Sequence, residues 1–177
     1  LNFGASAGST AVLAMQLSGV SARFGGSMLV QTNNATANTI TIGAGKTLQV
    51  DRTFTIGFNS TVNSTTNLNI SGAGTFKVGD VGTPTNLNFQ VGNGGGTNIS
   101  NAASLDMSGL SVFYANLGTG SLRVGSLTNG GVGTSAAASM LKLAEASTMP
   151  WMLALSFTTC STAWAKSACH CRHMVLT

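Results

Sequence analysis

A leucine returns about every 19 residues through most of this chain, and this repeat constrains the fold more than any other feature. Each leucine stands in a pattern of a small or polar residue, Leu, a polar residue and an apolar residue, as in "TLQV", "NLNI" and "SLRV". Six leucines stand in this pattern, and a step of 19 residues back from the first of them reaches a seventh, Leu29. The six are Leu48, Leu68, Leu87, Leu105, Leu122 and Leu141. Repeated units that cannot bury an apolar face alone stack on one another. The repeat therefore predicts a solenoid.

Alternation within the units indicates that the stacked elements are β-strands. The segments "TITIG" (39–43), "TFTIG" (53–57) and "TFKVG" (75–79) alternate polar and apolar residues, which turns one face of a strand inward. Clusters of Gly, Asn and Ser separate these segments, as turns require. We expect an all-β solenoid with rungs of about 19 residues. The alternative is a β-sandwich with turns at intervals of about 8–12 residues, but a sandwich has no reason to repeat its sequence.

The composition excludes two classes of protein. Charged residues make up only 7% of the chain, but hydrophobic residues make up 43%, so this is not a disordered chain starved of apolar side chains. The net charge of +4 comes from 8 basic and 4 acidic residues. In the repeat region the basic residues are spread singly, whereas nucleic-acid binding needs a concentrated positive field. We expect no nucleic-acid partner.

Two stretches, "IGAGKTLQVDRTFTIG" (42–57) and "ISGAGTFKVGD" (70–80), resemble the β-strand repeats of bacterial autotransporter-like passenger proteins and related secreted repeat proteins with C-terminal sorting tags. In that repeat a Ser-Gly-x-Gly turn precedes a Thr-apolar-x-apolar strand. The matching residues are Ser71, Gly72, Gly74, Thr75, Phe76 and Val78. The resemblance covers roughly residues 27–143. It implies a right-handed parallel β-helix that is secreted or held on the bacterial cell surface, often as a stalk or adhesin.

No segment matches a familiar chemical site. "GAGKT" (43–47) has Ile40 where a phosphate-binding loop needs its first Gly, and a strand pattern follows it where that loop needs a helix. "GNGGGTN" (92–98) lacks the Asp that calcium-binding turns carry. The acidic residues are Asp51, Asp80, Asp106 and Glu145. They stand at different places relative to the leucines, so we expect no carboxylate pair in a cleft. We predict no catalytic, cofactor-binding or metal residue, and no cofactor.

Two alternative functions stay open. A β-helix enzyme acting on polysaccharide would gather acidic and basic residues on one face. An ice- or carbohydrate-binding solenoid would present a regular threonine array. The pairs Thr39/Thr41 and Thr53/Thr55 fit such an array, but threonine pairs do not recur in every unit.

Residues 148–177 differ in composition from the residues before them. All three cysteines, both histidines and both tryptophans of the chain lie there. We divide the chain into a β-solenoid repeat region at 1–147 and an atypical tail at 148–177. The tail is a cap over the solenoid end, a small metal-binding segment, or a non-native segment translated out of frame, and the last explanation accounts best for the abrupt change. Pro150 and several Ser and Thr residues argue against a membrane span there.

The tail segment "ACHCRH" has the ligand types of a metal site. Its thiols and imidazoles belong to Cys169, His170, Cys171 and His173. Ligands that are consecutive in sequence converge poorly on the tetrahedral geometry of zinc. We interpret the cluster as a marker of the boundary and assign no function to it.

We predict a structural or adhesive fragment of a secreted or cell-surface bacterial repeat protein, without catalysis. The chain starts at Leu1 with no initiator methionine and no signal-peptide pattern, so we interpret it as a fragment or as a piece cut from a longer precursor. The expected location is extracellular or on the bacterial surface. The expected partners are host or surface glycans or other cell-surface proteins.

Overall fold

Parallel β-strands are the regular elements of the described structure. The computed structural model describes residues 1–4, 9–59, 64–79, 86–94, 101–127, 139–144 and 146–148. Within these ranges every regular element is a β-strand, and every strand pairing is parallel. The expected all-β fold is confirmed. The sandwich alternative fails because sandwiches pack antiparallel sheets.

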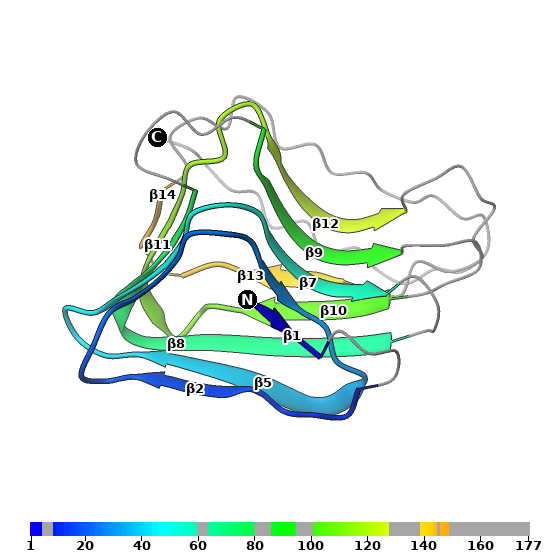
Figure 1. Cartoon of the computed structure of the whole chain (residues 1–177), viewed down its shortest axis with the longest axis horizontal. Helices are drawn as coiled ribbons and strands as arrows, with labels where there is room; N and C mark the ends of the chain where they lie inside the picture. The colour runs from blue at the N-terminus through cyan, green and yellow to red at the C-terminus, as the bar shows by residue number, and fades with distance from the viewer. Residues whose placement is uncertain are drawn as a thin grey trace.

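The strands form three stacks, which we call sheets A, B and C (Figure 1). Sheet A contains β1 (Asn2–Phe3), β4 (Met28–Val30), β7 (Phe54–Asn59), β9 (Asn88–Gly94) and β12 (Ser121–Leu127). Sheet B contains β2 (Ala14–Leu17), β5 (Asn34–Ile42), the first half of β8 (Ser64–Val78), β10 (Asn101–Asp106) and β13 (Met140–Lys142). Sheet C contains β3 (Ala22–Phe24), β6 (Thr47–Val50), the second half of β8, β11 (Leu110–Ala115) and β14 (Ala146–Thr148).

The chain passes through the sheets in a fixed cyclic order. It visits A, then B, then C, and completes this round five times between β1 and β14. We call each round a coil and number the coils 1 to 5 from the N-terminus. The third coil is β7 followed by β8, which belongs to sheet B before its bend and to sheet C after it. This order is compatible with the β-solenoid expected from the repeat.

The rung length expected from the leucine spacing is wrong. Leu68 is the strand neighbour of Leu105, and Leu105 is the strand neighbour of Leu141, so one coil spans about two of the leucine units in this part of the chain. The coils near the N-terminus are shorter, as the pairing of Ala14 with Thr39 shows. A coil is longer than the leucine spacing because successive leucines of the repeat lie on or next to different sheets. The leucine between Leu68 and Leu105 is Leu87, which packs against the core just before β9 of sheet A.

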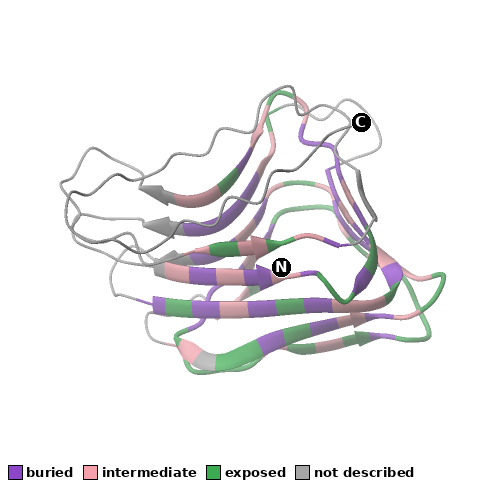
Figure 2. Cartoon of the chain, turned by 180° about the vertical axis from the view of Figure 1, so that it is seen from behind, coloured by how far each residue is buried: buried purple, intermediate pink, exposed green. Residues whose placement is uncertain are grey.

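Strand alternation fills the interior with apolar side chains. On β8 the residues facing inward are buried and those between them are more exposed, which gives the banding visible along the strands in Figure 2. The inward residues stack coil on coil: Ile40 lies beside Ile70, and Val50 lies beside Val78. All four of these side chains are fully buried. Burying one such side chain contributes about 1.5–3 kcal/mol, so these columns supply much of the stability.

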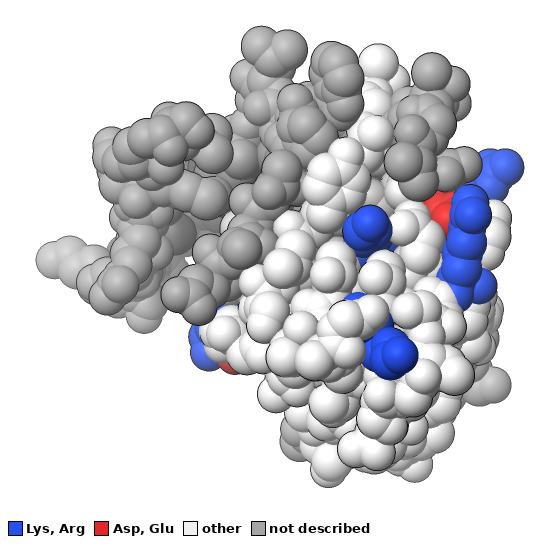
Figure 3. Space-filling model, turned by 90° about the vertical axis from the view of Figure 1, so that its left-hand side faces the viewer, with Lys and Arg blue, Asp and Glu red and all other residues white. Residues whose placement is uncertain are grey.

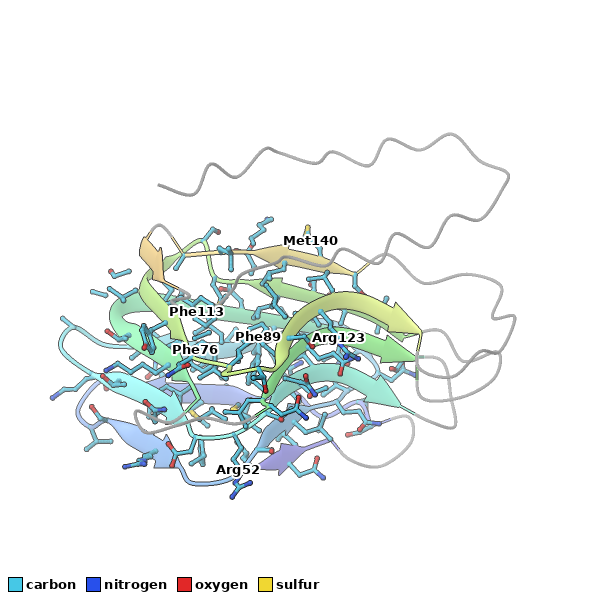
Figure 4. The ribbon with its side chains drawn as sticks, turned by 90° about the horizontal axis from the view of Figure 1, so that it is seen from above. Arg52, Phe76, Phe89, Phe113, Arg123 and Met140 are labelled. Atoms are coloured by element: carbon cyan, nitrogen blue, oxygen red, sulfur yellow. The ribbon has the colours of Figure 1, made fainter. Side chains whose placement is uncertain are left out.

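Four phenylalanines close a ring of contacts inside coils 3 and 4. Phe54 and Phe89 come from sheet A, and Phe76 and Phe113 come from sheet C. Each ring contacts two others, with centroid separations of 5.0 to 5.7 Å. In Figure 4 the labelled Phe76, Phe89 and Phe113 lie within the ring of strands. These contacts join sheet A to sheet C across the interior, and such aromatic pairs each contribute about 0.5–1.5 kcal/mol beyond burial.

A buried polar cluster lies where the chain passes from sheet A to sheet B. Asn38 donates from Nδ2 to Thr32 Oγ1 at 3.2 Å and to the carbonyl of Asn67 at 2.8 Å. Its Oδ1 accepts the backbone N–H of Leu13 at 2.9 Å. One side chain thus connects coils 1, 2 and 3. Because its hydrogen bonds are made, Asn38 is buried in the leucine column of sheet B without leaving a polar group unpaired.

Gly72 makes the bend that carries β8 from sheet B to sheet C. Its φ is +110°, which L side chains rarely adopt. A Cβ built there would clash with the carbonyl oxygen of Ile42 in the coil below. The Ser-Gly-x-Gly turn of the sequence is therefore a corner at which two coils touch through their backbones.

Candidate functional site

The carboxylate of Asp51 forms an ion pair with a residue of the preceding coil. We predicted no catalytic role for Asp51. It directly follows β6, and Arg23 Nε on β3 donates to both of its carboxylate oxygens, at 3.0 and 2.9 Å. The Asp51 side chain is 11% exposed and the Arg23 side chain is 61% exposed. The carboxylate is therefore covered by the cation and is not presented to solvent as a free group.

Asp106 is held in the same way, at a different corner. It ends β10, and Lys142 Nζ on β13 donates to its Oδ2 at 2.8 Å. Ser108 donates its backbone N–H to Oδ1 at 3.0 Å, and its hydroxyl donates to the same oxygen. The Lys142 hydrogen bond, followed by those of Ser108, lowers the pKa of Asp106 to about 2. The carboxylate stays ionised at neutral pH and is poorly suited to general acid chemistry.

The two described carboxylates are not brought together. Asp51 lies between sheet C and sheet A and bonds back to coil 1, whereas Asp106 lies between sheet B and sheet C and bonds forward to coil 5. Asp80 and Glu145 lie outside the described residues. The geometry thus gives this pair the role of fastening successive coils, and it assembles no acid–base pair from them.

The glycine-rich segments form turns and strands. In "GAGKT", Lys46 donates its backbone N–H to the carbonyl of Gly43 at 3.0 Å, and β6 begins at the next residue. A strand after the loop removes the helix N-terminus that a phosphate-binding loop would use. In "GNGGGTN", residues 92–94 end β9, and residues 95–98 lie outside the described residues.

The two threonine pairs lie on different sheets. Thr39 and Thr41 are on β5 of sheet B, whereas Thr55 is on β7 of sheet A and Thr53 immediately precedes it. In the next coil, Thr39 faces Asn69 and Thr41 faces Ser71. A flat threonine array needs the same residue in successive coils on one sheet, and these pairs do not form one.

The described residues contain neither a cluster of metal ligands nor a membrane-spanning helix. Among the described residues, no group of three or more His, Cys, Asp or Glu side chains is close enough to hold a metal ion. Cys169, His170, Cys171 and His173 lie outside the described residues, as does the rest of the tail beyond Thr148. The described part of the chain contains no helix with the length and apolar character needed to cross a membrane.

One surface was not visible in the sequence. Lys46 immediately precedes β6 and Arg52 follows it closely, so the two cations flank the strand in sheet C. Lys77 on β8 is the strand neighbour of Gln49, in the middle of β6. Residues that are spread singly along the chain thus gather on one sheet. Only the register between coils 2 and 3 could have revealed this.

Comparison with known proteins identifies no relative of this chain. No family model matches the chain, and neither the curated proteins nor the solved structures include a significant match. The function is therefore argued from the geometry of this chain.

Proposed function

We propose that this chain is a structural or adhesive part of a secreted or cell-surface bacterial repeat protein and has no catalytic role. It would serve as a stiff module that holds a surface out for contact with glycans or with other cell-surface proteins. The proposal keeps the resemblance of residues 27–143 to autotransporter-like passenger repeats as its starting point.

The observation that carries the proposal is the continuity of the coils. Apolar columns run through successive coils, as in the stack Met28, Phe54, Phe89 and Leu122 of sheet A. Ion pairs at Arg23–Asp51 and Lys142–Asp106 add ties between coils on the outside. A module built in this way resists bending because each coil is paired along its length with the next.

The coils are right-handed in this proposal. Each return from one strand to its neighbour in the same sheet is a parallel crossover, and such crossovers are right-handed in about 98% of known cases. An experimental structure in which the coils wind to the left would contradict this part of the proposal.

Two alternatives receive less support from the described residues. A polysaccharide-acting enzyme needs converging acidic residues, and the described Asp51 and Asp106 are separated and ion-paired. An ice-binding surface needs a regular threonine array, and the two threonine pairs lie on sheets A and B.

Binding and turnover can be measured together on the full 177-residue chain. Fluorescently labelled chain would be incubated with intact bacterial and host cells and with immobilised polysaccharides. The proposal expects retention on at least one such surface, with no new reducing ends after prolonged incubation. Release of reducing sugars would favour the enzyme, and inhibition of ice recrystallisation without retention would favour the ice-binding alternative.

A further inference from the structure

Three cations surround the outer surface of sheet C. Lys46 and Arg52 lie three residues before and three residues after Gln49, and Lys77 is beside Gln49 in the next coil. Three residues of extended strand span about 10 Å, and neighbouring strands are about 4.8 Å apart. Lys46 and Arg52 therefore lie near the two ends of β6, Arg52 within the bend that follows the strand, and the three positive charges are widely spaced around sheet C.

Among the described residues, these three cations are the ones on this side without acidic partners. Arg23 and Lys142 are in ion pairs with Asp51 and Asp106. Lys46, Arg52 and Lys77 make no ion pair with any described residue. Figure 3 looks onto this side of the molecule and shows separate groups of Lys and Arg on a surface that is otherwise almost uncharged. In Figure 4 the labelled Arg52 points away from the core.

The surface beside Lys77, on β8 and β11, offers contacts for a sugar polymer. Tyr114, the one tyrosine of the chain, is the strand neighbour of Lys77 in coil 4 and is partly exposed. Val112 is 39% exposed and lies beside the partly exposed Thr75. A ring with a polar tip, a hydroxyl and an apolar side chain suit the mixed polar and apolar faces of sugars.

We propose that the outer surface of sheet C, defined by Lys46, Arg52, Lys77 and Tyr114, binds an acidic polysaccharide. The cations would contact carboxylate or sulfate groups, and Tyr114 would contact a sugar ring. This inference deepens the proposed adhesive function and rests on it. It names the ligand class and the surface, neither of which the repeat pattern predicts.

The spacing of the charges favours this ligand over nucleic acid. Duplex DNA has a phosphate about every 3.4 Å along each strand, and proteins that bind it place many cations against the backbone. Besides Arg23, which is in an ion pair with Asp51, sheet C presents three cations at intervals near the Debye length of about 10 Å at 0.1 M salt. A polysaccharide with an acid group on alternate sugars has charges spaced widely enough to meet them singly.

The test compares two charge-neutralised forms of the full chain. The first is the triple variant Lys46→Gln, Arg52→Gln and Lys77→Gln. The control is Arg123→Gln, which removes one exposed cation from sheet A and leaves sheet C intact; it is matched in net charge to the single variant Lys77→Gln, which should lose more affinity. Circular dichroism of each variant establishes that it is folded. The probes are hyaluronan oligosaccharides, neutral dextran of similar length and a single-stranded oligothymidine.

We expect hyaluronan to bind the parent chain with an affinity that falls as salt is added. The triple variant should lose about tenfold or more of this affinity, and Arg123→Gln should stay close to the parent. Tyr114→Ala should weaken hyaluronan binding without changing its dependence on salt. Equal losses in the triple variant and in Arg123→Gln would overturn the inference, and so would tighter binding of oligothymidine than of hyaluronan.

The failure of this inference is distinguishable from failure of the proposed function. Retention on cells or on dextran that the triple variant leaves unchanged would overturn the role of sheet C while the adhesive function stands. Absence of binding to hyaluronan, dextran and cells alike would count against both.

Discussion

The side chain of Thr66 hydrogen-bonds both backbone groups of Thr32 in the coil before it. Thr66 Oγ1 donates to the carbonyl oxygen of Thr32 at 2.8 Å and accepts its N–H at 3.1 Å. Both residues are buried, at 0% and 1% exposure. The hydroxyl thus takes the place of a strand partner at the corner between sheets A and B, where the ladder of backbone bonds is interrupted.

Replacing this hydroxyl should destabilise the chain. Thr66→Val keeps the shape of the side chain but leaves a buried N–H and a buried C=O unpaired, at an expected cost of about 2 kcal/mol or more. Thr66→Ser keeps the hydroxyl and removes one buried methyl group, at a cost of about 1 kcal/mol. Urea unfolding of both variants measures the difference. A serine variant as unstable as the valine variant would contradict the role of the hydrogen bonds.

The length of the coil can be tested by coupling between leucines. Leu68 and Leu105 are strand neighbours in sheet B, whereas Leu87, midway between them in sequence, packs near sheet A. Leu68→Ala and Leu105→Ala should each cost about 2–5 kcal/mol, and their combination should depart from additivity by about 0.5 kcal/mol or more.

The matched cycle pairs Leu68→Ala with Leu87→Ala. Leu68 and Leu87 are not strand neighbours, so this second cycle should come closer to additivity than the first. The same urea unfolding measurements serve both cycles. Stronger coupling between Leu68 and Leu87 than between Leu68 and Leu105 would favour one rung for each leucine unit over the longer coils.

The strands were predictable from local pattern, and the coil was not. Alternation in "TFKVG" identified Phe76 and Val78 as inward residues, because side-chain direction follows from the period of a strand. The coil length depends on how much chain each turn consumes, which alternation does not encode. We therefore predicted that one leucine period corresponds to one coil, whereas the coil from Leu68 to Leu105 contains about two leucine periods.

The charged surface was unpredictable for the same reason. Lys46, Arg52 and Lys77 look scattered in the sequence, and only the pairing of Gln49 with Lys77 brings them to one sheet. The separation of Asp51 from Asp106 was expected from their different places relative to the leucines. Their ion pairs with Arg23 and Lys142 were not expected, since each joins residues one coil apart.

Gly72 should tolerate no side chain. Gly72→Ala forces an L residue to a φ of +110° and drives its Cβ toward the backbone of Ile42, so we expect a loss of about 2 kcal/mol or more. Gly26→Ala is the matched control, because a Cβ there meets nothing within 4 Å and its φ is not in the strained region. The control should change stability by about 0.5 kcal/mol or less. Thermal unfolding separates them, and an equal, small effect of both would show that the corner can relax.

The ion pair of Asp106 predicts a specific loss of stability in acid. Its pKa in the folded chain is about 2, below the value of about 3.9 for an unperturbed aspartate. A carboxyl whose pKa is lowered by folding adds stability above its unfolded pKa and loses it as the pH falls toward the folded pKa. The Lys142 side chain is 51% exposed, so solvent screening limits the contribution to about 0.5–1 kcal/mol.

Asp106→Asn isolates this contribution. At pH 7 the variant should be less stable than the parent by about 0.5–1 kcal/mol, and the difference should shrink between about pH 4 and pH 2. Lys142→Met removes the strongest cause of the lowered pKa, so its deficit should shrink over the same pH range. Chemical unfolding at several pH values gives both curves. A deficit in Asp106→Asn that stays constant from pH 7 to pH 2 would mean that Asp106 stabilises coils 4 and 5 through hydrogen bonds that a neutral carboxyl also makes, and not through its charge.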